Sequence, residues 1–278
     1  MEIRLGPAGL PISLEKNRNT IEAIKFLREI GLNAMEIEFV RNIYLDKNSA
    51  KEVRKEAEKN NVELSVHAPY FINLLGEKTT IQNSIKRIVE SAKIAEILDA
   101  KFVVVHAAYY GKYSKEEAYQ KMIEITNKIL EKLDKAKIKN SKIAYETMAK
   151  ESQFADLETL LKLKEEINDK RIDVCIDFAH IFVRNDGKID YKKILDVLEQ
   201  HGFKELHTHF SNVKYNLKTK KFQDIHIPIN SHPKFEPLAK EIINRNFEKV
   251  TIISESPILE KDSLKMKKIF EELGIKIV

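Results

Sequence analysis

Six side chains of the kinds that bind zinc stand at the ends of short, mostly apolar runs in this sequence. VELSV ends at His67, KFVVV at His106, IAY at Glu146, VCI at Asp177, ELHT at His209 and TIIS at Glu255. Successive members are 39, 40, 31, 32 and 46 residues apart, about the length of one strand-plus-helix unit in a (β/α)8 barrel. In that fold the C-terminal ends of the strands meet at one mouth, where active sites are built. The spacing therefore predicts a multinuclear metal site.

These residue types suit hydrolysis of a phosphodiester. Zinc accepts histidine nitrogen and carboxylate oxygen, and catalytic zinc sites keep a position open for water. Such ions lower the pKa of water and neutralise charge on a phosphate and its leaving oxygen. A carboxylate has two oxygens and can bridge two ions, which fits Glu146 on a central strand. Any one of the six residues alone has the simpler reading of a hydrogen-bonded or solvated polar side chain.

Three further residues extend the set of possible ligands. His180 lies three residues after Asp177 in CIDFAH, so it can reach the same mouth from the following loop. Asp224 and His226 are two apart in QDIHIP, and an extended loop would place both on one face. A D-x-H sequence in a loop is a weak signal by itself. Together with His180, it predicts a third site made of two histidines and one carboxylate.

Strand and helix patterns alternate along the whole chain and provide the elements that would position these residues. Strands are expected at Ile3–Leu5, Ala34–Phe39, Val62–Val66, Lys101–Val105, Lys142–Tyr145, Ile172–Ile176, Glu205–Thr208 and Val250–Ser254. Helices are expected at Thr20–Ile30, Ser49–Asn60, Thr80–Leu98, Ser114–Lys137, Asp156–Ile167, Tyr191–Gln200, Phe235–Asn244 and Asp262–Leu273. Strict alternation favours a parallel sheet. With no linker, repeat or low-complexity tract in view, we expect one (β/α)8 barrel domain over residues 1–278, with Ser211–Pro233 as its longest irregular segment.

Composition sets broader limits on what the protein can be. The net charge of +5 suits a polyanionic partner, although a lysine-rich solvated surface gives the same sum. Cys175 is the lone cysteine, so no intramolecular disulfide can form, and we expect it to fill the core. The N-terminus has no apolar signal region and no apolar run approaches the length of a membrane span. We therefore expect a soluble, cytoplasmic protein that does not contact a membrane.

Four segments make the resemblance to one family specific. SVHAPYFINL (Ser65–Leu74), CIDFAH, ISESP (Ile253–Pro257) and LGPAGLP (Leu5–Pro11) closely resemble endonuclease IV, the zinc-dependent AP endonuclease family, and above all its archaeal branch. The similarity runs essentially from end to end and implies three Zn²⁺ per chain, with Mn²⁺ as an option at one site. It implies that the first zinc is held by His67, His106 and a bridging, catalytic Glu146; the second by Glu146, Asp177, His209 and Glu255; the third by His180, Asp224 and His226.

All nine positions hold the residue type that the family pattern requires, but two loops depart from it. The family's typical H-P-G or H-A-G reads His106-Ala107-Ala108 in this chain. After Glu146, Ala149 and Ala155 stand where archaeal relatives prefer glycine. These changes leave the ligands in place and bear on local loop geometry.

The resemblance also implies how an abasic nucleotide would be recognised. A nucleotide that has lost its base costs less to extrude from the duplex, and apolar or aromatic wedges fill the gap. Tyr70 and Phe71 match the family's inserting pair, and Arg41 in FVRN is the expected companion that reaches into the base stack. The simpler alternatives are packing beneath the loop for Tyr70 and a solvated loop charge for Arg41.

Two strands carry polar residues in alternation. His207 and His209 face the same way, and the family pattern selects His209 as the ligand. His207 should then lie one layer deeper, hydrogen-bonded in the barrel core. Of Glu36 and Glu38, we expect one to point into the barrel and to pair with Arg4, which is a structural role and not ligation.

The function implied is incision of duplex DNA 5′ to abasic sites in base excision repair, leaving a 3′-hydroxyl and a 5′-deoxyribose phosphate, by a protein acting as a monomer. The main alternative is a sugar isomerase or epimerase on the same barrel, in which Glu146, Asp177, His209 and Glu255 would hold one Mn²⁺ or Co²⁺. The extra ligands and the aromatic pair are not needed by a one-metal isomerase. A DNA-binding protein that no longer cleaves is a third alternative, which the complete ligand set disfavours.

Overall fold

Eight parallel strands form the central sheet of this protein. The structure is a computed structural model that describes residues 1–14 and 18–277. The strands are β1 (Glu2–Pro7), β2 (Ala34–Glu38), β3 (Glu63–His67), β4 (Phe102–Val105), β5 (Lys142–Glu146), β6 (Ile172–Asp177), β7 (Glu205–Phe210) and β10 (Lys249–Ser254). Their order is β1-β10-β7-β6-β5-β4-β3-β2, and a parallel bridge from Ala8 to Glu36 joins the two ends of that order. The predicted (β/α)8 barrel is confirmed.

All the helices but one, a short helix that follows β6, lie where the 3.6-residue periodicity predicts them, within a few residues at each end. They are α1 (Thr20–Glu29), α2 (Lys47–Asn60), α3 (Lys78–Leu98), α4 (Lys115–Lys135), α5 (Leu157–Ile167), α6 (Phe178–Arg184), α7 (Tyr191–Gln200), α8 (Phe235–Ile243) and α9 (Glu260–Glu272). Their starts follow the sequence signals. Ser114 and Glu117 form the expected capping box at α4, and Asp156 caps α5 by accepting the Thr159 N–H.

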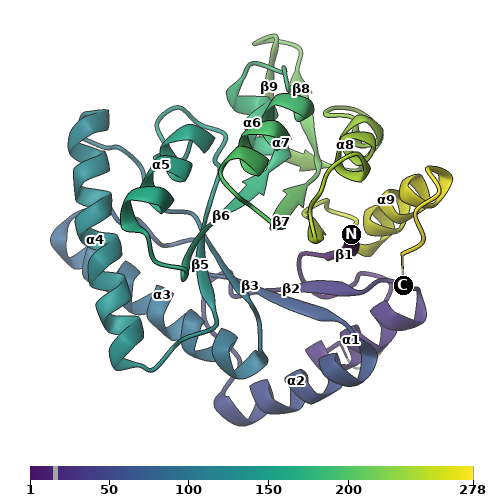
Figure 1. Ribbon diagram of the computed structural model, residues 1–278, viewed down its shortest axis with the longest axis horizontal. Helices are drawn as coiled ribbons and strands as arrows, with labels where there is room; N and C mark the ends of the chain where they lie inside the picture. Colours follow the sequence, from purple (N-terminus) through teal and green to yellow (C-terminus); the bar gives the residue numbers. More distant parts are fainter. Residues whose placement is uncertain (15–17, 278) are drawn as a thin grey trace. The chain divides into compact units, whose positions relative to one another are not determined.

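A β-hairpin and a short helix differ from the sequence-based expectation. The segment Ser211–Pro233 is not irregular, because it contains an antiparallel hairpin of β8 (Asn212–Asn216) and β9 (Lys221–Ile227). The hairpin lies beside α6, a short helix that the sequence reading missed (Figure 1). The hairpin side chains Val213 and Phe222 pack with Ala179 and Phe182 of that helix. Its four lysines (Lys214, Lys218, Lys220 and Lys221), set among other polar residues, made this segment look like a long polar loop.

The chain divides into two compact units. We call residues 37–55 and 64–175 the central unit, and residues 1–36, 56–63 and 176–278 the terminal unit. The single domain expected over 1–278 stays a prediction.

The central unit is built on β3, β4 and β5. The four residues of β4, Phe-Val-Val-Val, are all buried, as a strand covered on both faces requires. Val103 pairs with Val66 on one side and Ile143 on the other. Cys175 is buried in a cluster with Phe102, Val104 and Ala144, so the predicted core role of this cysteine is confirmed.

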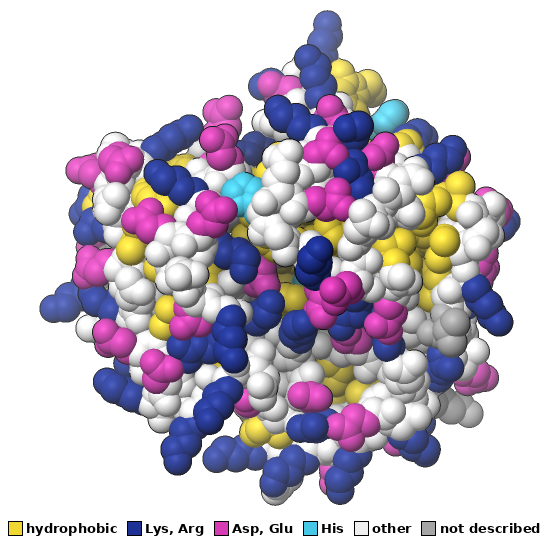
Figure 2. Space-filling view, in the orientation of Figure 1, with side chains coloured by type: hydrophobic (Ala, Val, Ile, Leu, Met, Phe, Trp, Pro, Cys, Tyr) yellow, Lys and Arg dark blue, Asp and Glu magenta, His cyan; other side chains and the backbone are white. Residues whose placement is uncertain are grey.

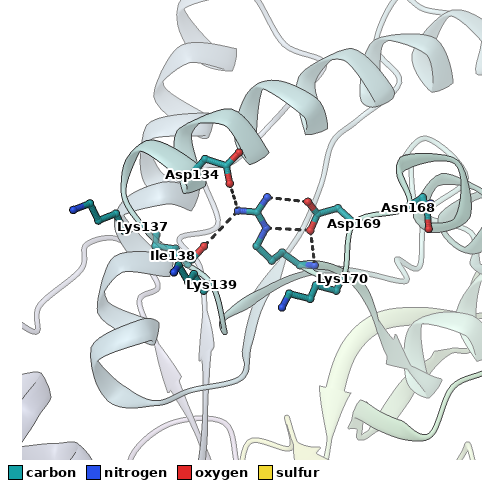
Figure 3. Close-up of a pocket in the computed structure, with 8 residues that line it drawn as sticks. Asp134, Lys137, Ile138, Lys139, Asn168, Asp169 and Lys170 are labelled. Carbon is teal, nitrogen blue, oxygen red and sulfur yellow. Dashed lines mark hydrogen bonds and ion pairs between the residues drawn. The ribbon is translucent and has the colours of Figure 1, made fainter.

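Two charged side chains, Arg171 and Glu96, hold the loop between α4 and β5. Arg171 donates to Asp134 at 2.6 Å, to Asp169 through two nitrogens and to the carbonyl oxygen of Ile138, at the edge of a cavity of about 470 Å³ (Figure 3). These ion pairs lie at the N-terminal ends of β5 and β6, away from the strand ends that carry the candidate ligands. They tie two connecting loops together and are structural.

Glu96 on α3 holds the same loop from the other side. Its carboxylate accepts the backbone N–H groups of Lys139, Asn140 and Ser141 at 2.9–3.2 Å. Partial burial opposes ionisation, but these donors hold the pKa of Glu96 below its usual value. Its stabilising effect is therefore present above the unfolded-state pKa and is lost as the pH falls through the folded-state pKa.

Replacing Glu96 by alanine should destabilise the protein by about 1–3 kcal/mol, because three backbone donors lose their acceptor. Urea unfolding at neutral pH measures the loss, which should shrink in acid, below about pH 4.5, where the wild-type carboxylate also loses its charge. Glu90→Ala is the control, because Glu90 lies on the same helix and its side chain is 44% exposed. Equal stability of the two variants at neutral pH would contradict this role.

The terminal unit is organised around β1 and its neighbour β10, which pair in register from Glu2–Lys249 to Pro7–Ser254. Asn33 fixes the backbone beside β1, because its side chain accepts the Leu5 N–H at 2.8 Å and donates to the Ile3 carbonyl oxygen. Gly6 lies so close to the Ala34 carbonyl that a Cβ there would be 1.7 Å from the oxygen. Only glycine fits at that position.

The expected pairing of Arg4 with Glu36 or Glu38 is wrong. Arg4 binds Glu2 and the backbone and side chain of Asn61 at the opposite end of β1. Arg4 lies near the N-terminal end of β1, where the loops that precede the strands of a parallel sheet are found. Glu36 lies deeper in the barrel, out of reach of Arg4.

The surface charge is mixed. Basic and acidic side chains are interspersed over the face seen in Figure 2 and do not gather into one basic region there. Within residues 1–14 and 18–277, no helix is long and apolar enough to cross a membrane.

Candidate metal centre

One group of metal-binding side chains lies in the central unit. His67 ends β3, His106 follows β4 and Glu146 ends β5, and these three strands are neighbours in the sheet. The Nε2 atoms of His67 and His106 lie 3.4 and 2.9 Å from Glu146 Oε2. One ligand atom from each residue lies within 4.8 Å of the other two. His67 and Glu146 are buried, while the His106 side chain is one-quarter exposed and gives the group access to solvent.

The orientation of His67 suits a ligand. Its Nδ1 lies 2.8 Å from the carbonyl oxygen of Ala68. A carbonyl can only accept, so Nδ1 carries the proton and Nε2 has its lone pair directed at Glu146. Metal-binding histidines commonly have this second contact, which fixes the ring and its tautomer.

A second group lies in the terminal unit. The Asp177 carboxylate ends β6 and caps α6, accepting the His180 N–H at 2.7 Å. His180 Nδ1 is 3.4 Å from Asp177 Oδ2, and its Nε2 is 3.2 Å from Asp224 Oδ1. Asp224 and His226 lie on β9, with His226 Nε2 3.7 Å from Asp224 Oδ1. The extended conformation predicted for the D-x-H segment is therefore present and places both side chains with His180.

His209 and Glu255 continue this group within the same unit. His209 near the end of β7 has its Nδ1 3.3 Å from Oε1 of Glu255, the residue after β10. The other oxygen of Glu255 lies 3.8 Å from His226 Nδ1. Glu255 is thus placed between His209 and the Asp224–His226 pair.

The sequence reading missed the partner of His209 on its other side. Glu36 on β2 is fully buried, with Oε1 2.9 Å from His209 Nε2 and Oε2 2.9 Å from His207 Nε2. Burial would raise the pKa of Glu36, but the nearby His209 and His207 hold it well below its usual value. The prediction that His207 lies hydrogen-bonded in the core is confirmed.

The residues predicted to contact DNA lie in the central unit beside the His67 group. Tyr70 and Phe71 follow β3 and are 46% and 58% exposed. The Tyr70 ring lies 5.1 Å from that of His67 and 5.4 Å from that of His106, and its hydroxyl donates to Glu38 at 3.2 Å. Arg41 is exposed in the loop after β2. Packing beneath a loop does not describe Tyr70, but contact with DNA stays a prediction for all three residues.

The donor sets fit zinc. Both groups offer imidazole nitrogen and carboxylate oxygen, which are zinc ligands at about 2.0–2.2 Å. Two ligands of one ion then lie within about 4.4 Å of each other, and the spacing of up to 4.8 Å in the His67, His106, Glu146 and the Asp177, His180, His226 groups needs only small side-chain shifts. Which ion each group holds stays a prediction, as does the bridging role of Glu146.

Comparison with known proteins gives the class. The chain matches a family model described as a xylose isomerase-like TIM barrel over residues 24–273 and belongs to that family. It is 36% identical to an uncharacterized protein of Methanocaldococcus jannaschii, over 96% of this chain and 97% of the relative. It is 28% identical to a probable endonuclease 4 of Mycoplasmopsis synoviae (71% and 70% of the two chains) and 30% identical to one of Mycoplasma genitalium (74% and 71%). Within the family, the chain is an endonuclease IV-like protein.

Solved structures agree on the fold. A D-tagatose 3-epimerase-like protein has a TM-score of 0.74 at 21% identity, covering 98% of this chain and 96% of its own. Endonuclease IV from Thermus thermophilus has a TM-score of 0.69 at 18% identity, covering 96% and 98%. At these identities the two likenesses show the barrel alone, so the choice between activities depends on the site.

Proposed function

We propose that this protein is a zinc-dependent AP endonuclease that hydrolyses the phosphodiester 5′ to abasic sites in duplex DNA, leaving a 3′-hydroxyl and a 5′-deoxyribose phosphate. The observation that carries the proposal is the number of ligands grouped in each unit. His67, His106 and Glu146 form one group, and Asp177, His180, Asp224 and His226 form another. Phosphodiester hydrolysis uses several ions to bind the phosphate and stabilise the leaving oxygen, and the relatives named as probable endonuclease 4 support that reading.

Zinc, when bound, would lower the pKa of water and neutralise charge on the phosphate. The chain's own residues supply the positions. Ala68 holds the His67 ring through Nδ1, and the buried Glu146 has one oxygen, Oε2, facing both His67 and His106. His106 borders solvent, where a phosphate could approach. By the resemblance, Glu146 would help to hold the first two of three zinc ions.

The exposed aromatic residues Tyr70 and Phe71 would recognise the damaged duplex. Tyr70 and Phe71 lie outside the core, and the Tyr70 ring is next to His67 and His106, so a Tyr70 side chain that entered the duplex would remain adjacent to the metal ligands. Aromatic and apolar wedges hold kinked or unstacked DNA in this way. Arg41 would act beside them, from the loop after β2.

The alternative is a sugar isomerase or epimerase that uses one divalent ion. This class is considered because one structural neighbour is a D-tagatose 3-epimerase-like protein, although the similarity is one of fold only. Such an enzyme has no use for His67, His106, His180, Asp224 and His226 together. It also has no use for two exposed aromatic residues beside the site.

Incubating the zinc-loaded protein with a duplex that contains one abasic site should give a single cut on its 5′ side, with a 3′ end that a DNA polymerase extends. EDTA should lower the rate by at least about 100-fold, because the protein groups alone cannot generate hydroxide at neutral pH, and added Zn²⁺ should restore it. The same duplex with an intact base is the control substrate.

The alternative is tested with the same preparation. A ketose converted to its epimer in the presence of Mn²⁺, with the abasic duplex left intact after zinc reconstitution, would overturn the nuclease proposal in favour of the sugar enzyme. Tight binding of the abasic duplex without any incision would identify the protein as one that binds damaged DNA only.

A further inference from the structure

We propose that Glu36 is a positioning residue for the metal centre: it holds the proton of His209 on Nε2 and thereby directs Nδ1 of the same ring at a metal ion. This inference rests on the proposed function, in that His209 is taken to be a ligand. Glu36 itself is not among the predicted ligands.

The His209 ring lies between two carboxylates that differ in position. Its Nε2 is 2.9 Å from Glu36 Oε1, at hydrogen-bond distance, and its Nδ1 is 3.3 Å from Glu255 Oε1. Glu255 sits at the strand end, beside His226, whereas Glu36 is fully buried on β2. The two nitrogens of one ring therefore face a predicted metal ligand on one side and a buried carboxylate on the other.

Chemistry decides which nitrogen carries the proton. A carboxylate only accepts hydrogen bonds, and the two oxygens of Glu36 lie 2.9 Å from Nε2 of His209 and 2.9 Å from Nε2 of His207, so this geometry places the proton of His209 on Nε2. A neutral imidazole has one proton, so Nδ1 then has a lone pair to give to a metal. A carboxylate–histidine–metal arrangement of this kind fixes the ring and raises the basicity of the ligand.

His207 holds the Glu36 carboxylate from the interior of the barrel. Its Nε2 donates to Oε2 of Glu36 at 2.9 Å, so each oxygen of this buried carboxylate faces one imidazole nitrogen. Burying a charge without such partners is costly. His207 therefore stabilises the ionised form of Glu36 that His209 needs.

The backbone of Glu36 is held as firmly as its side chain. Its carbonyl oxygen accepts the Gly9 N–H at 2.9 Å, and Glu36 is the residue that bridges to Ala8 where β2 meets the end of β1. The carboxylate is thus placed by the closure of the barrel, and the orientation of His209 depends on it.

Glu36→Gln tests the inference, because the amide keeps the shape but loses the charge that fixes the proton. Zinc content after dialysis and zinc affinity by competition with a chelating dye should show one ion held about 10- to 100-fold more weakly, with the others retained. Glu63→Gln is the matched control, since Glu63 is a largely buried carboxylate of the same unit that binds Lys249 and Thr251 instead of a histidine. Equal zinc affinity in wild type and a folded Glu36→Gln variant would overturn the inference.

A measurement on the wild-type protein avoids any folding defect of the variant. In zinc-loaded protein with ¹⁵N-labelled histidine, NMR couplings should show His209 protonated on Nε2 and bound to metal through Nδ1. The opposite tautomer would overturn the inference while leaving the nuclease proposal intact. A wild-type protein that binds no zinc at all would refute the proposed function itself.

Discussion

Replacing Glu146 by glutamine should abolish incision of abasic duplex while leaving binding of that duplex within a few-fold of wild type. Glu146 is buried at the end of β5 with one oxygen 2.9 Å from His106 and 3.4 Å from His67. Glutamine preserves the shape but replaces a charged oxygen by an amide, which is a poor ligand for zinc. Residues that only support metal ligands cost about 10- to 100-fold when mutated, so a bridging ligand should cost more.

Single-turnover cleavage measures the incision rate, and a gel-shift titration of the same labelled duplex measures binding. Glu151→Gln is the matched control, because Glu151 is an exposed glutamate in the loop after β5. Turnover near the wild-type rate in Glu146→Gln would contradict the bridging role. Loss of cleavage and binding together, with a lowered melting temperature, would point to misfolding and not to the chemistry.

Gly6→Ala should destabilise the protein by more than about 4 kcal/mol or prevent its folding, the range reached when backbone atoms are forced to move in a packed core. The added Cβ would lie 1.7 Å from the carbonyl oxygen of Ala34 and 2.3 Å from its carbonyl carbon. Both atoms belong to backbone in a strand, so neither can turn aside as a side chain would.

Thermal and urea unfolding of purified variants measure the effect. The control is Gly202→Ala, at a positive φ of 75° with nothing within 4 Å of the added atom. That change should cost only about 1 kcal/mol, the ordinary penalty for alanine in the left-handed region. A Gly6→Ala protein as stable as Gly202→Ala would show that β1 and β2 separate more easily than their contact distance indicates.

The pattern of polar residues at strand ends predicted both the fold and the grouping of the candidate ligands. In a barrel, residues at the ends of successive strands lie close together even when they are far apart in the sequence. His67, His106 and Glu146 are about 40 residues apart in sequence, yet they end neighbouring strands. Period-two and period-3.6 patterns located these strands and their helices to within a few residues. Tyr70 and Phe71 were proposed as wedge residues only through family resemblance, since nothing in their spacing distinguishes an exposed aromatic pair from a packed one.

What the sequence could not reveal is contact between side chains that no periodicity relates. Glu36 and His207 are 171 residues apart, and the alternation of β2 shows that Glu36 and Glu38 face one side without showing which histidine lies there. Arg4 was assigned to the wrong partner for the same reason. The β8–β9 hairpin was missed because lysine and asparagine dominate its composition, although Val213 and Phe222 mark its buried face.

The pairing of β1 with β10 has a consequence for how the protein is made. All six residues of β1 take their ladder partners from Lys249–Ser254, 247 residues further along the chain. Translation must therefore deliver all the other strands of the sheet before β1 can satisfy its hydrogen bonds along that edge. The strand of this sheet that is made first is thus one of the last to reach its final place.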